Sequence, residues 1–346
     1  MDAKRSVMLQ DMEQIARNTQ IPWEKLKDKH VLVTGATGLI GCAVVKALLH
    51  RSQTAGDNIW VVALVRDPEK AKAMFPEENA GLAFVTGTLE NMPAMDMPVD
   101  YIIHCACPTD SSFFLNRPVD TIDTILAGTQ NILELAREKK SQGVVFLSSM
   151  EVYGSVPEEK NLSEDMLGQI DLMSPRSCYP MAKRMAENMC CSYWAQHQVP
   201  AVICRLAQTF GPGVRMDDRR VFAYMARCAM AGTDIELATS GSKKNMYLYT
   251  ADAVTAILMI LLLGQPGTAY NAANMNTYCS VKEMAQAVAE HLGQGKVSVK
   301  VNMQANMNQL FRPDGFLKLD TQKLQALGWQ PAVDLIEMYK RMISAF

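Results

Sequence analysis

A short glycine-rich segment behind an apolar stretch constrains this fold more than any other part of the chain. Residues 29–34 (KHVLVT) suit a buried strand, the segment Gly35–Gly41 (GATGLIG) follows directly, and a helical pattern then runs from Leu39 to His50. Glycines at a strand-to-helix turn permit a tight reversal and close packing of the helix against the strand. This arrangement is typical of the first strand and helix of a doubly wound α/β sheet.

The alternation of strands and helices continues through the first two thirds of the chain. Further apolar strands are expected at Ile59–Val65, Ala83–Thr86, Tyr101–Cys105, Gly143–Ser148 and Ala201–Leu206. Helices are expected between them, at Pro68–Phe75, Val119–Lys139 and Ala182–His197. Buried strands that alternate with helices form a parallel sheet with right-handed crossovers. The predicted fold class is therefore α/β, a doubly wound, Rossmann-like parallel sheet with a smaller C-terminal substrate lobe.

The alternation breaks down after Gly211, and this change gives the expected domain boundaries. We predict an N-terminal helical extension at residues 1–27 and a dinucleotide-binding domain at residues 28–210, to which residues 246–264 return. The substrate lobe is predicted to consist of two parts, residues 211–245 and 265–346. The returning segment is expected to be a buried helix because it carries the longest apolar run. The extension is interpreted as a packing helix or a dimer-contact helix.

Composition and charge exclude several classes of function. The net charge of −2 and the pI near 6.2 give no basic stripe of the kind that binds nucleic acid. The longest apolar run is shorter than the roughly 20 residues that span a membrane, and the first residues lack the apolar core of a secretory signal. Nine cysteines without zinc spacing are expected to be reduced thiols of a cytoplasmic protein that has no metal site.

The glycine segment has the order of a dinucleotide-binding turn. Gly35 permits the turn, Gly38 lets a pyrophosphate approach the backbone, and Gly41 lets the helix pack on the strand. Backbone N–H groups and the helix dipole would then hold the phosphates. The expected contacts come from Gly35, Thr37, Gly38, Leu39, Ile40 and Gly41, and Lys183 is expected to contact the cofactor as well.

The end of the second strand leaves the choice between NAD and NADP open. Val65 stands where a carboxylate for the ribose 2′-hydroxyl is expected, and Arg66 would pair with the 2′-phosphate of NADP. Alternatively, Asp67 reaches the ribose of NAD and Arg66 stacks on the adenine. A third interpretation gives both residues only to the turn before Pro68.

Three polar residues form a candidate catalytic set. Tyr179 and Lys183 are four residues apart at the start of a helix, which places them on one face. The lysine ammonium and a positively charged nicotinamide would lower the pKa of the tyrosine, so that it can act as a base. Ser149 follows a strand whose C-terminal end opens onto the expected cofactor crevice, and its hydroxyl would hold the same substrate oxygen.

Four segments resemble one family in order and spacing. They are residues 34–41 (TGATGLIG), 148–154 (SSMEVYG), 179–183 (YPMAK) and 205–213 (RLAQTFGPG). The chain resembles the NAD-dependent epimerase/dehydratase family, of the extended short-chain dehydrogenase/reductase type, over about residues 29–331. It is most similar to the UDP-glucuronate decarboxylases through residues 107–110 (CPTD), 175–191 (PRSCYPMAKRMAENMCC) and 214–222 (VRMDDRRVF).

The resemblance implies a shared first step on a nucleotide-sugar substrate with NAD, or NADP, as the cofactor. Tyr179 takes the proton of the sugar 4-hydroxyl, Ser149 orients that oxygen, and C4 is oxidised. The 4-keto sugar is then decarboxylated, dehydrated or reduced again on the other face. Glu151 matches a glutamate of the decarboxylases and 4,6-dehydratases, whereas simple 4-epimerases have no acid there. A homodimer without a nucleic-acid or membrane partner is expected.

Met150 departs from the family and bears on the outcome of the reaction. It occupies the position of the aspartic acid that protonates the leaving hydroxyl in 4,6-dehydratases, and the decarboxylases usually have a serine there. Because methionine donates no proton, we expect no dehydration by that route. Decarboxylation is the first hypothesis and 4-epimerisation the second. An NADP-dependent reductase and a non-catalytic binding protein are the remaining alternatives.

The residues expected around the substrate's phosphates also depart from the family. Gln208 replaces an asparagine, and Asn245 replaces an arginine that pairs with the diphosphate. Lysine at 243 or 244 would supply that charge without the bidentate fork of arginine. Arg220 matches a decarboxylase arginine, and Arg312 is a further candidate. The predicted substrate-binding residues are thus Gln208, Arg220, Lys243, Lys244, Asn245 and Arg312.

Overall fold

A parallel sheet of seven strands forms the centre of the computed structural model, which describes residues 3–75, 81–108, 111–303 and 315–346. The strand order is β11-β7-β5-β4-β1-β2-β3, and each neighbouring pair is parallel. The strands are β1 (His30–Thr34), β2 (Trp60–Val65), β3 (Leu82–Thr86), β4 (Tyr101–His104), β5 (Gly143–Ser149), β7 (Ala201–Leu206) and β11 (Ala269–Ala272). The doubly wound α/β fold class is confirmed.

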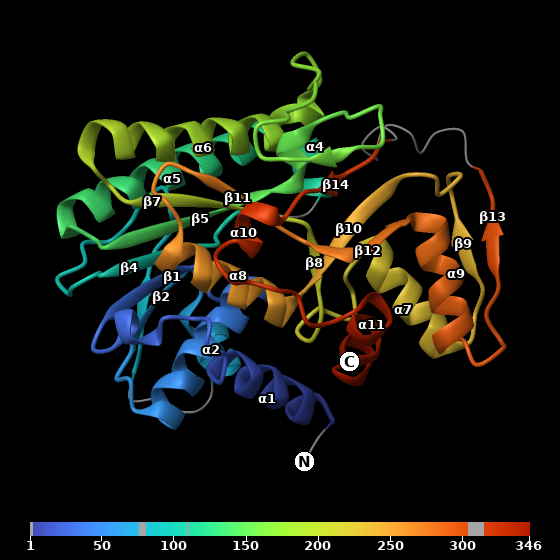
Figure 1. The fold of residues 1–346 in the computed structure, drawn as a ribbon, viewed down its shortest axis with the longest axis horizontal. Coiled ribbons are helices and arrows are strands. Elements are labelled where there is room, and N and C mark those ends of the chain that lie inside the picture. The colour runs from blue at the N-terminus through green and yellow to red at the C-terminus, as the bar shows by residue number, and fades with distance from the viewer. Residues whose placement is uncertain (1–2, 76–80, 109–110, 304–314) are drawn as a thin grey trace.

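Helices cover both faces of this sheet (Figure 1). On one face α5 (Pro118–Lys139) and α6 (Cys178–His197) pack on each other and on β5. On the other face α2 (Leu39–Ala55) packs on β1 and β2, and α8 (Thr250–Leu263) packs on β5 and β7. Because α8 lies between the sheet and the helices below it, nearly all of its residues are buried, which explains its uniformly apolar sequence.

A smaller lobe continues from the carboxyl edge of the sheet (Figure 1). Its sheet has the order β12-β10-β8, and a second pair joins β9 to β13. These strands are β8 (Gln208–Phe210), β9 (Ile235–Leu237), β10 (Lys244–Tyr249), β12 (Asn274–Ser280) and β13 (Val299–Val301). The helices of the lobe are α7 (Val221–Ala231), α9 (Val281–Leu292) and α11 (Leu335–Ser344).

Short elements connect these layers. A two-stranded pair joins β6 (Asn161–Leu162) to β14 (Lys318–Leu319). The remaining helices are α1 (Ala3–Ala16), α3 (Pro68–Met74), α4 (Ser111–Asn116) and α10 (Gln322–Gln325). Within the described residues, 3₁₀ turns occur at η1 (Trp23–Leu26), η2 (Met150–Tyr153) and η3 (Pro175–Ser177).

The structure corrects three expected boundaries. The segment returning to the main domain was expected to start at residue 246, but β10 continues to Tyr249 in the second sheet. The lobe was expected to begin again at residue 265, but β11 is the edge strand of the main sheet, in register with β7. The predicted main domain ran to residue 210, but β8 pairs with β10 in the second sheet. Both β8 and β11 have only three or four residues, so their own pattern does not show which sheet they join.

The N-terminal helix is a packing helix in this chain. It contacts α2, α8 and α11, and its Met12 and Ile15 are buried. Asp11 is also buried, where it accepts a hydrogen bond from the Tyr249 hydroxyl (2.6 Å) and pairs with Arg341 (3.1 Å). The extension and the C-terminal helix are therefore joined through one buried carboxylate.

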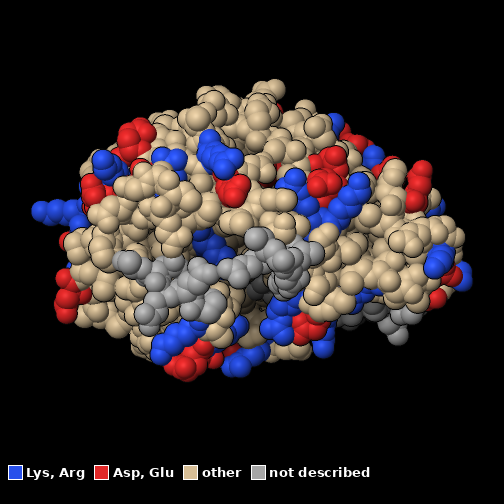
Figure 2. Space-filling model, turned by 90° about the horizontal axis from the view of Figure 1, so that it is seen from below, with Lys and Arg blue, Asp and Glu red and all other residues tan. Residues whose placement is uncertain are grey.

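The surface carries both signs of charge, and the described helices are short or polar. Figure 2 shows lysine and arginine interspersed with aspartate and glutamate over the face seen from below. Within the described ranges, none of the helices combines the length and the apolar character needed to cross a membrane.

A second buried carboxylate, Asp252, should make stability depend on pH. Burial raises its pKa to about 6, with nearby Asp11 adding to the effect, although the Ala332 and Val333 N–H groups donate to it. The folded protein therefore holds this proton more tightly than the unfolded chain, whose aspartate pKa is about 3.9. The group stabilises the fold increasingly as pH falls through about 6, and this contribution is fully present below about 4.

We therefore expect Asp252→Asn to flatten the pH dependence of stability. Relative to the parent, the free energy of unfolding of the variant should fall by roughly 2 kcal/mol between about pH 7 and pH 4. Urea denaturation across this range measures the difference. Parallel pH profiles for the two proteins would contradict this account of Asp252.

Candidate active site

The glycine turn between β1 and α2 has the shape that its sequence predicts. Gly35 has a φ of +66°, a conformation that side chains rarely adopt, and a Cβ there would lie 2.8 Å from the Ala106 amide nitrogen. A Cβ at Gly41 would collide with the Gly35 carbonyl. At Gly38 the nearest atom to an added Cβ is the Gly35 oxygen, at 3.2 Å, and that neighbour belongs to the turn itself.

This turn fits the phosphates of a dinucleotide. Gly38 is the N-cap of α2 and has no side chain to accept from the first amides of the helix. Those amides and the positive end of the helix dipole are thus left to an external anion. On the other side of the turn, Gly213 lies against the Leu39 side chain, which places the loop after β8 near the same crevice.

Arg66 and Asp67 follow β2 at the same edge. The Asp67 carboxylate caps α3 by accepting a hydrogen bond from the Lys70 amide (3.0 Å), and Pro68 is the next residue. Arg66 is exposed, and its charge lies near Glu90. Asp67 therefore belongs to the turn before α3, as one interpretation of the sequence expected. The contacts of Arg66 and Asp67 with ribose, adenine or a 2′-phosphate stay predictions.

A buried histidine supports the chain beside the glycine turn. The His104 Nδ1 lies 2.8 Å from the Thr34 hydroxyl, and that hydroxyl accepts from the Ala106 amide (3.1 Å). Burial lowers the pKa of His104 to about 3, and the Lys183 charge adds to the effect. His104 is thus a neutral structural residue and is unsuited to act as a base.

Tyr179 lies in the interior at the start of α6. Its ring stacks on Phe114 with centroids 4.4 Å apart, and only 8% of the residue is exposed. Burial raises the pKa of Tyr179 well above its usual value, and the Cys107 and Glu151 charges act in the same direction. A hydrogen bond with Ser149 lowers the pKa and joins the two predicted residues. In the protein without a bound cofactor, the Tyr179 phenol is therefore protonated at neutral pH.

Lys183 lies one helical turn further along α6 on the same face. Its Nζ donates to the Leu147 carbonyl (2.6 Å) and lies 5.9 Å from the centroid of the Tyr179 ring. Cys107 is hydrogen-bonded to the same ammonium, yet burial raises the pKa of its thiol. The ammonium is therefore next to the phenol, as the four-residue spacing predicts, in a site with little water.

Glu151 completes the group and has a partner that the sequence did not predict. The Arg176 Nη2 lies 3.0 Å and 3.2 Å from the two carboxylate oxygens of Glu151. The same guanidinium lies over the Phe114 ring, with 5.2 Å between its carbon and the ring centroid. Arg176, Phe114 and Glu151 thus form one wall beside Tyr179.

Arg176 and Phe114 were not predicted as site residues because their signals in the sequence are weak. Arg176 stands three residues before Tyr179 in a short 3₁₀ turn, and Phe114 stands in α4 far earlier in the chain. Arginine and phenylalanine are common at surfaces and in cores, so neither was distinctive alone. The only available signal was that Arg176 and Cys107 lie inside segments that resemble the decarboxylases.

The predicted substrate residues do not gather as closely. Lys244 pairs with Glu159 (3.3 Å), whereas Asn245 is buried, and successive strand residues point to opposite faces. Lys243 lies just before β10 and is half-buried. The position of Lys244 therefore does not favour it as the replacement cation.

The other predicted substrate residues lie apart from these. Arg220 occupies the N-cap position of α7 without a capping hydrogen bond from its side chain and pairs with Asp218 (2.6 Å), while Gln208 begins β8 beside Tyr247. Arg312 lies outside the described residues. The six substrate assignments stay predictions.

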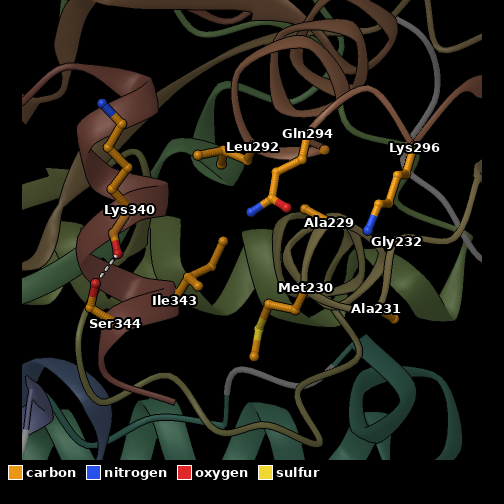
Figure 3. A pocket seen from close by; sticks show the side chains of 11 residues that line it. Ala229, Met230, Ala231, Gly232, Leu292, Gln294, Lys296, Lys340, Ile343 and Ser344 are labelled. Carbon is orange, nitrogen blue, oxygen red and sulfur yellow. Dashed lines mark hydrogen bonds between the residues drawn. The ribbon is translucent and has the colours of Figure 1, made fainter.

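A hollow of about 420 Å³ lies elsewhere in the lobe, between the ends of α7, α9 and α11 (Figure 3). Lys340 and Ser344 come from α11, and Gln294 and Lys296 follow α9. Its lining contains none of the predicted site residues, so it is separate from the crevice at the sheet edge.

The fold and this group of residues define the class of the protein. A parallel sheet with a glycine turn for a dinucleotide, a serine at the end of β5, and a tyrosine and a lysine at the start of α6 make it an enzyme of the short-chain dehydrogenase/reductase type. Residues 31–273 match the NAD dependent epimerase/dehydratase family, and the chain belongs to that family. The family assigns NAD as the cofactor.

Relatives in this family agree with the resemblance in the sequence. The chain is 31% identical to UDP-glucuronic acid decarboxylase 6 of Arabidopsis thaliana over 311 residues, which cover 89% of this chain and 85% of the relative. It is 28% identical to UDP-glucuronic acid decarboxylase 1 of Xenopus tropicalis, covering 92% and 72%.

Solved structures share the fold at lower identity. UDP-glucuronic acid 4-epimerase from Bacillus cereus, in complex with UDP-glucuronic acid and NAD, has a TM-score of 0.74 at 20% identity and covers 91% of this chain and 98% of its own. The dTDP-glucose 4,6-dehydratase DesIV from Streptomyces venezuelae, with NAD bound, also has a TM-score of 0.74, at 21% identity, covering 91% and 95%.

Removing the Tyr179 hydroxyl should stop proton transfer without loss of the fold. Tyr179→Phe keeps the ring that stacks on Phe114, so we expect the thermal unfolding temperature and the Kd for NAD to remain close to those of the parent. Turnover should fall by about 10²-fold or more because the acid/base group is gone. A folded variant with the parent's turnover would show that Tyr179 is not this group.

Proposed function

We propose that this chain is an NAD-dependent decarboxylase of UDP-glucuronate that acts through oxidation at C4. The observation that carries the proposal is the position of Glu151. Its carboxylate is held by Arg176 and lies close enough to Tyr179 to raise the pKa of the tyrosine. Simple 4-epimerases of the family have no acid at this position. The two curated relatives described above are named as UDP-glucuronic acid decarboxylases.

The chain's own residues would divide the first step between them. Ser149 and Tyr179 share a hydrogen bond, so both hydroxyls can hold the 4-oxygen of the sugar. Lys183 keeps a positive charge beside the phenol as Tyr179 takes the proton, which favours the phenolate. NAD, when bound, would accept the hydride from C4 and would return it after carbon dioxide has left and C5 has taken up a proton, so that the net change in the substrate is the loss of carbon dioxide.

The second step needs orientation more than acid catalysis. Once C4 is a ketone, the carboxylate at C5 belongs to a β-keto acid, and such acids lose carbon dioxide readily. Glu151 and Arg176 are placed on the wall beside Tyr179 and would hold the substrate there. Met150 stands at the start of the same 3₁₀ turn and offers no proton to a leaving hydroxyl. This favours decarboxylation and opposes 4,6-dehydration.

A nucleotide-sugar 4-epimerase is the second candidate function. Oxidation and re-reduction at C4 need only the serine, tyrosine and lysine, which the structure brings together. The same fold also occurs in an epimerase that is crystallised with UDP-glucuronic acid. The carboxylate of Glu151 has no assigned part in this reaction, which is why it ranks second.

The mass of the sugar product separates these functions. We expect incubation with UDP-glucuronate and NAD to give a product lighter by carbon dioxide, measured by mass spectrometry. An unchanged mass with formation of the 4-epimer would replace the decarboxylase by the epimerase. Loss of water from a hexose nucleotide tested in parallel would contradict the interpretation of Met150.

We also propose that the protein is a homodimer through α5 and α6. These helices pack side by side, and they expose Val119, Ile122 and Met185 to 65%, 36% and 51%. Large apolar side chains on adjacent helices favour a protein partner, and a second copy of the chain offers the matching surface.

Charges on this face should dissociate the dimer. The double substitution Ile122→Asp with Met185→Asp would bury two carboxylates in the interface, so we expect light scattering after gel filtration to give half the parent's mass. Val301→Asp, on exposed β13 in the other lobe, is the matched control and should leave the mass unchanged. A monomeric parent, or a double variant of parental mass, would contradict the proposal.

A cytoplasmic location agrees with the state of the cysteines. All nine are free thiols, and burial raises the pKa of the thiol well above its usual value at four of them, Cys105, Cys190, Cys204 and Cys279. Free, buried thiols suit a reducing compartment.

A further inference from the structure

A buried ion pair lies directly behind the candidate catalytic residues. The Arg205 Nη2 on β7 is 2.7 Å from one Glu187 oxygen on α6, and the arginine Nε is 3.0 Å and 3.2 Å from the two oxygens. The residues are 5% and 7% exposed. Ser148 pairs in register with Arg205 on the neighbouring strand, and its hydroxyl donates to the same Glu187. Three elements of the main domain therefore meet at one carboxylate.

The same arginine continues the network toward the other side of the site. Its Nη1 donates to the Tyr153 hydroxyl (3.1 Å) and to the Glu164 carbonyl (2.6 Å). The Tyr153 hydroxyl in turn donates to the Asn271 Oδ1 on β11 (2.7 Å). Tyr153 is fully buried, so water cannot take the place of these hydrogen-bond partners of its hydroxyl.

Asn271 ties the network to the chain before and after it. Its Nδ2 donates to the Leu162 carbonyl on β6 (3.0 Å) and to the Asp320 carbonyl just after β14 (2.9 Å). β14 also contacts β10 and β12 of the smaller lobe. A continuous set of hydrogen bonds therefore runs from α6 to the strand that borders the lobe.

Each catalytic candidate is attached to a member of this network. Glu187 is one helical turn beyond Lys183 on the same face of α6 as Tyr179. Ser148 immediately precedes Ser149, and Tyr153 ends the 3₁₀ turn that carries Glu151. A change in the network would therefore move these groups even though the network side chains need not touch the substrate.

We propose that Tyr153, Arg205 and Glu187 are positioning residues that fix Ser149, Glu151 and Tyr179 relative to one another and couple them to the segment around β14. This inference rests on the proposed function for the identity of the reaction. A shift of about 1 Å between reacting groups is enough to reduce a rate by as much as 10²-fold. Turnover should therefore respond to the network more than substrate binding does.

Tyr153→Phe is the sharpest test because it removes one hydroxyl and leaves the Arg205–Glu187 pair in place. Tyr193→Phe is the matched control, since that hydroxyl donates to Glu134 (2.7 Å) near the far end of α6. With UDP-glucuronate and NAD, we expect kcat of Tyr153→Phe to fall about tenfold or more while KM changes less than about twofold. The control should keep both constants. Parental kcat in Tyr153→Phe, or an equal loss in the control, would overturn the proposal.

Hydrogen exchange gives a readout that does not depend on the reaction. The amides of Gly154 and Asp320 are hydrogen-bonded to Glu151 and Leu162, on the two sides of the network. We expect Tyr153→Phe to speed exchange at both, and Tyr193→Phe at neither. Faster exchange at Gly154 alone would refute the coupling. If the parent acts on no nucleotide sugar, the proposed function fails, and the exchange measurement still decides the network.

Discussion

In a parallel sheet all strands end at the same edge, and the candidate site of this protein is assembled at that edge, with Tyr179 and Lys183 added from the start of α6. β1, β4 and β5 are neighbours, so the glycine turn, the chain after His104 and Ser149 meet although they are far apart in sequence. The loop after each strand is free to carry chemistry, because the strands themselves supply the packed core.

Burial then sets the electrostatics of the site. Tyr179 has its pKa raised by desolvation, and His104 is kept neutral for the same reason. Charges in such surroundings are stable only when they are paired, as Glu151 is with Arg176 and Glu187 is with Arg205. The site therefore combines a protonated phenol with a few fixed charges, which suits proton transfer under the control of a bound cofactor.

The sequence predicted those parts that depend on local pattern. The strand, glycine turn and helix around Gly38 were predicted from adjacent residues, as was the spacing of Tyr179 and Lys183. Arg176 and Phe114 were missed because their roles come from contacts between separate elements. Lys243 or Lys244 was expected to replace a diphosphate arginine; Lys244 pairs with Glu159, and the choice of the replacement cation stays a prediction.

The amino-acid sequence by itself determined the α/β class, the glycine turn between the first strand and helix, and the placement of Tyr179 and Lys183 on one helical face, because each follows from periodicity or short spacing. Only the tertiary structure decided that β11 joins the main sheet, that Glu151 faces Arg176, and that Tyr153 joins Arg205 to Asn271. These contacts join residues from 25 to 118 positions apart. Their formation depends on how helices and strands pack, and no local pattern in the chain specifies that.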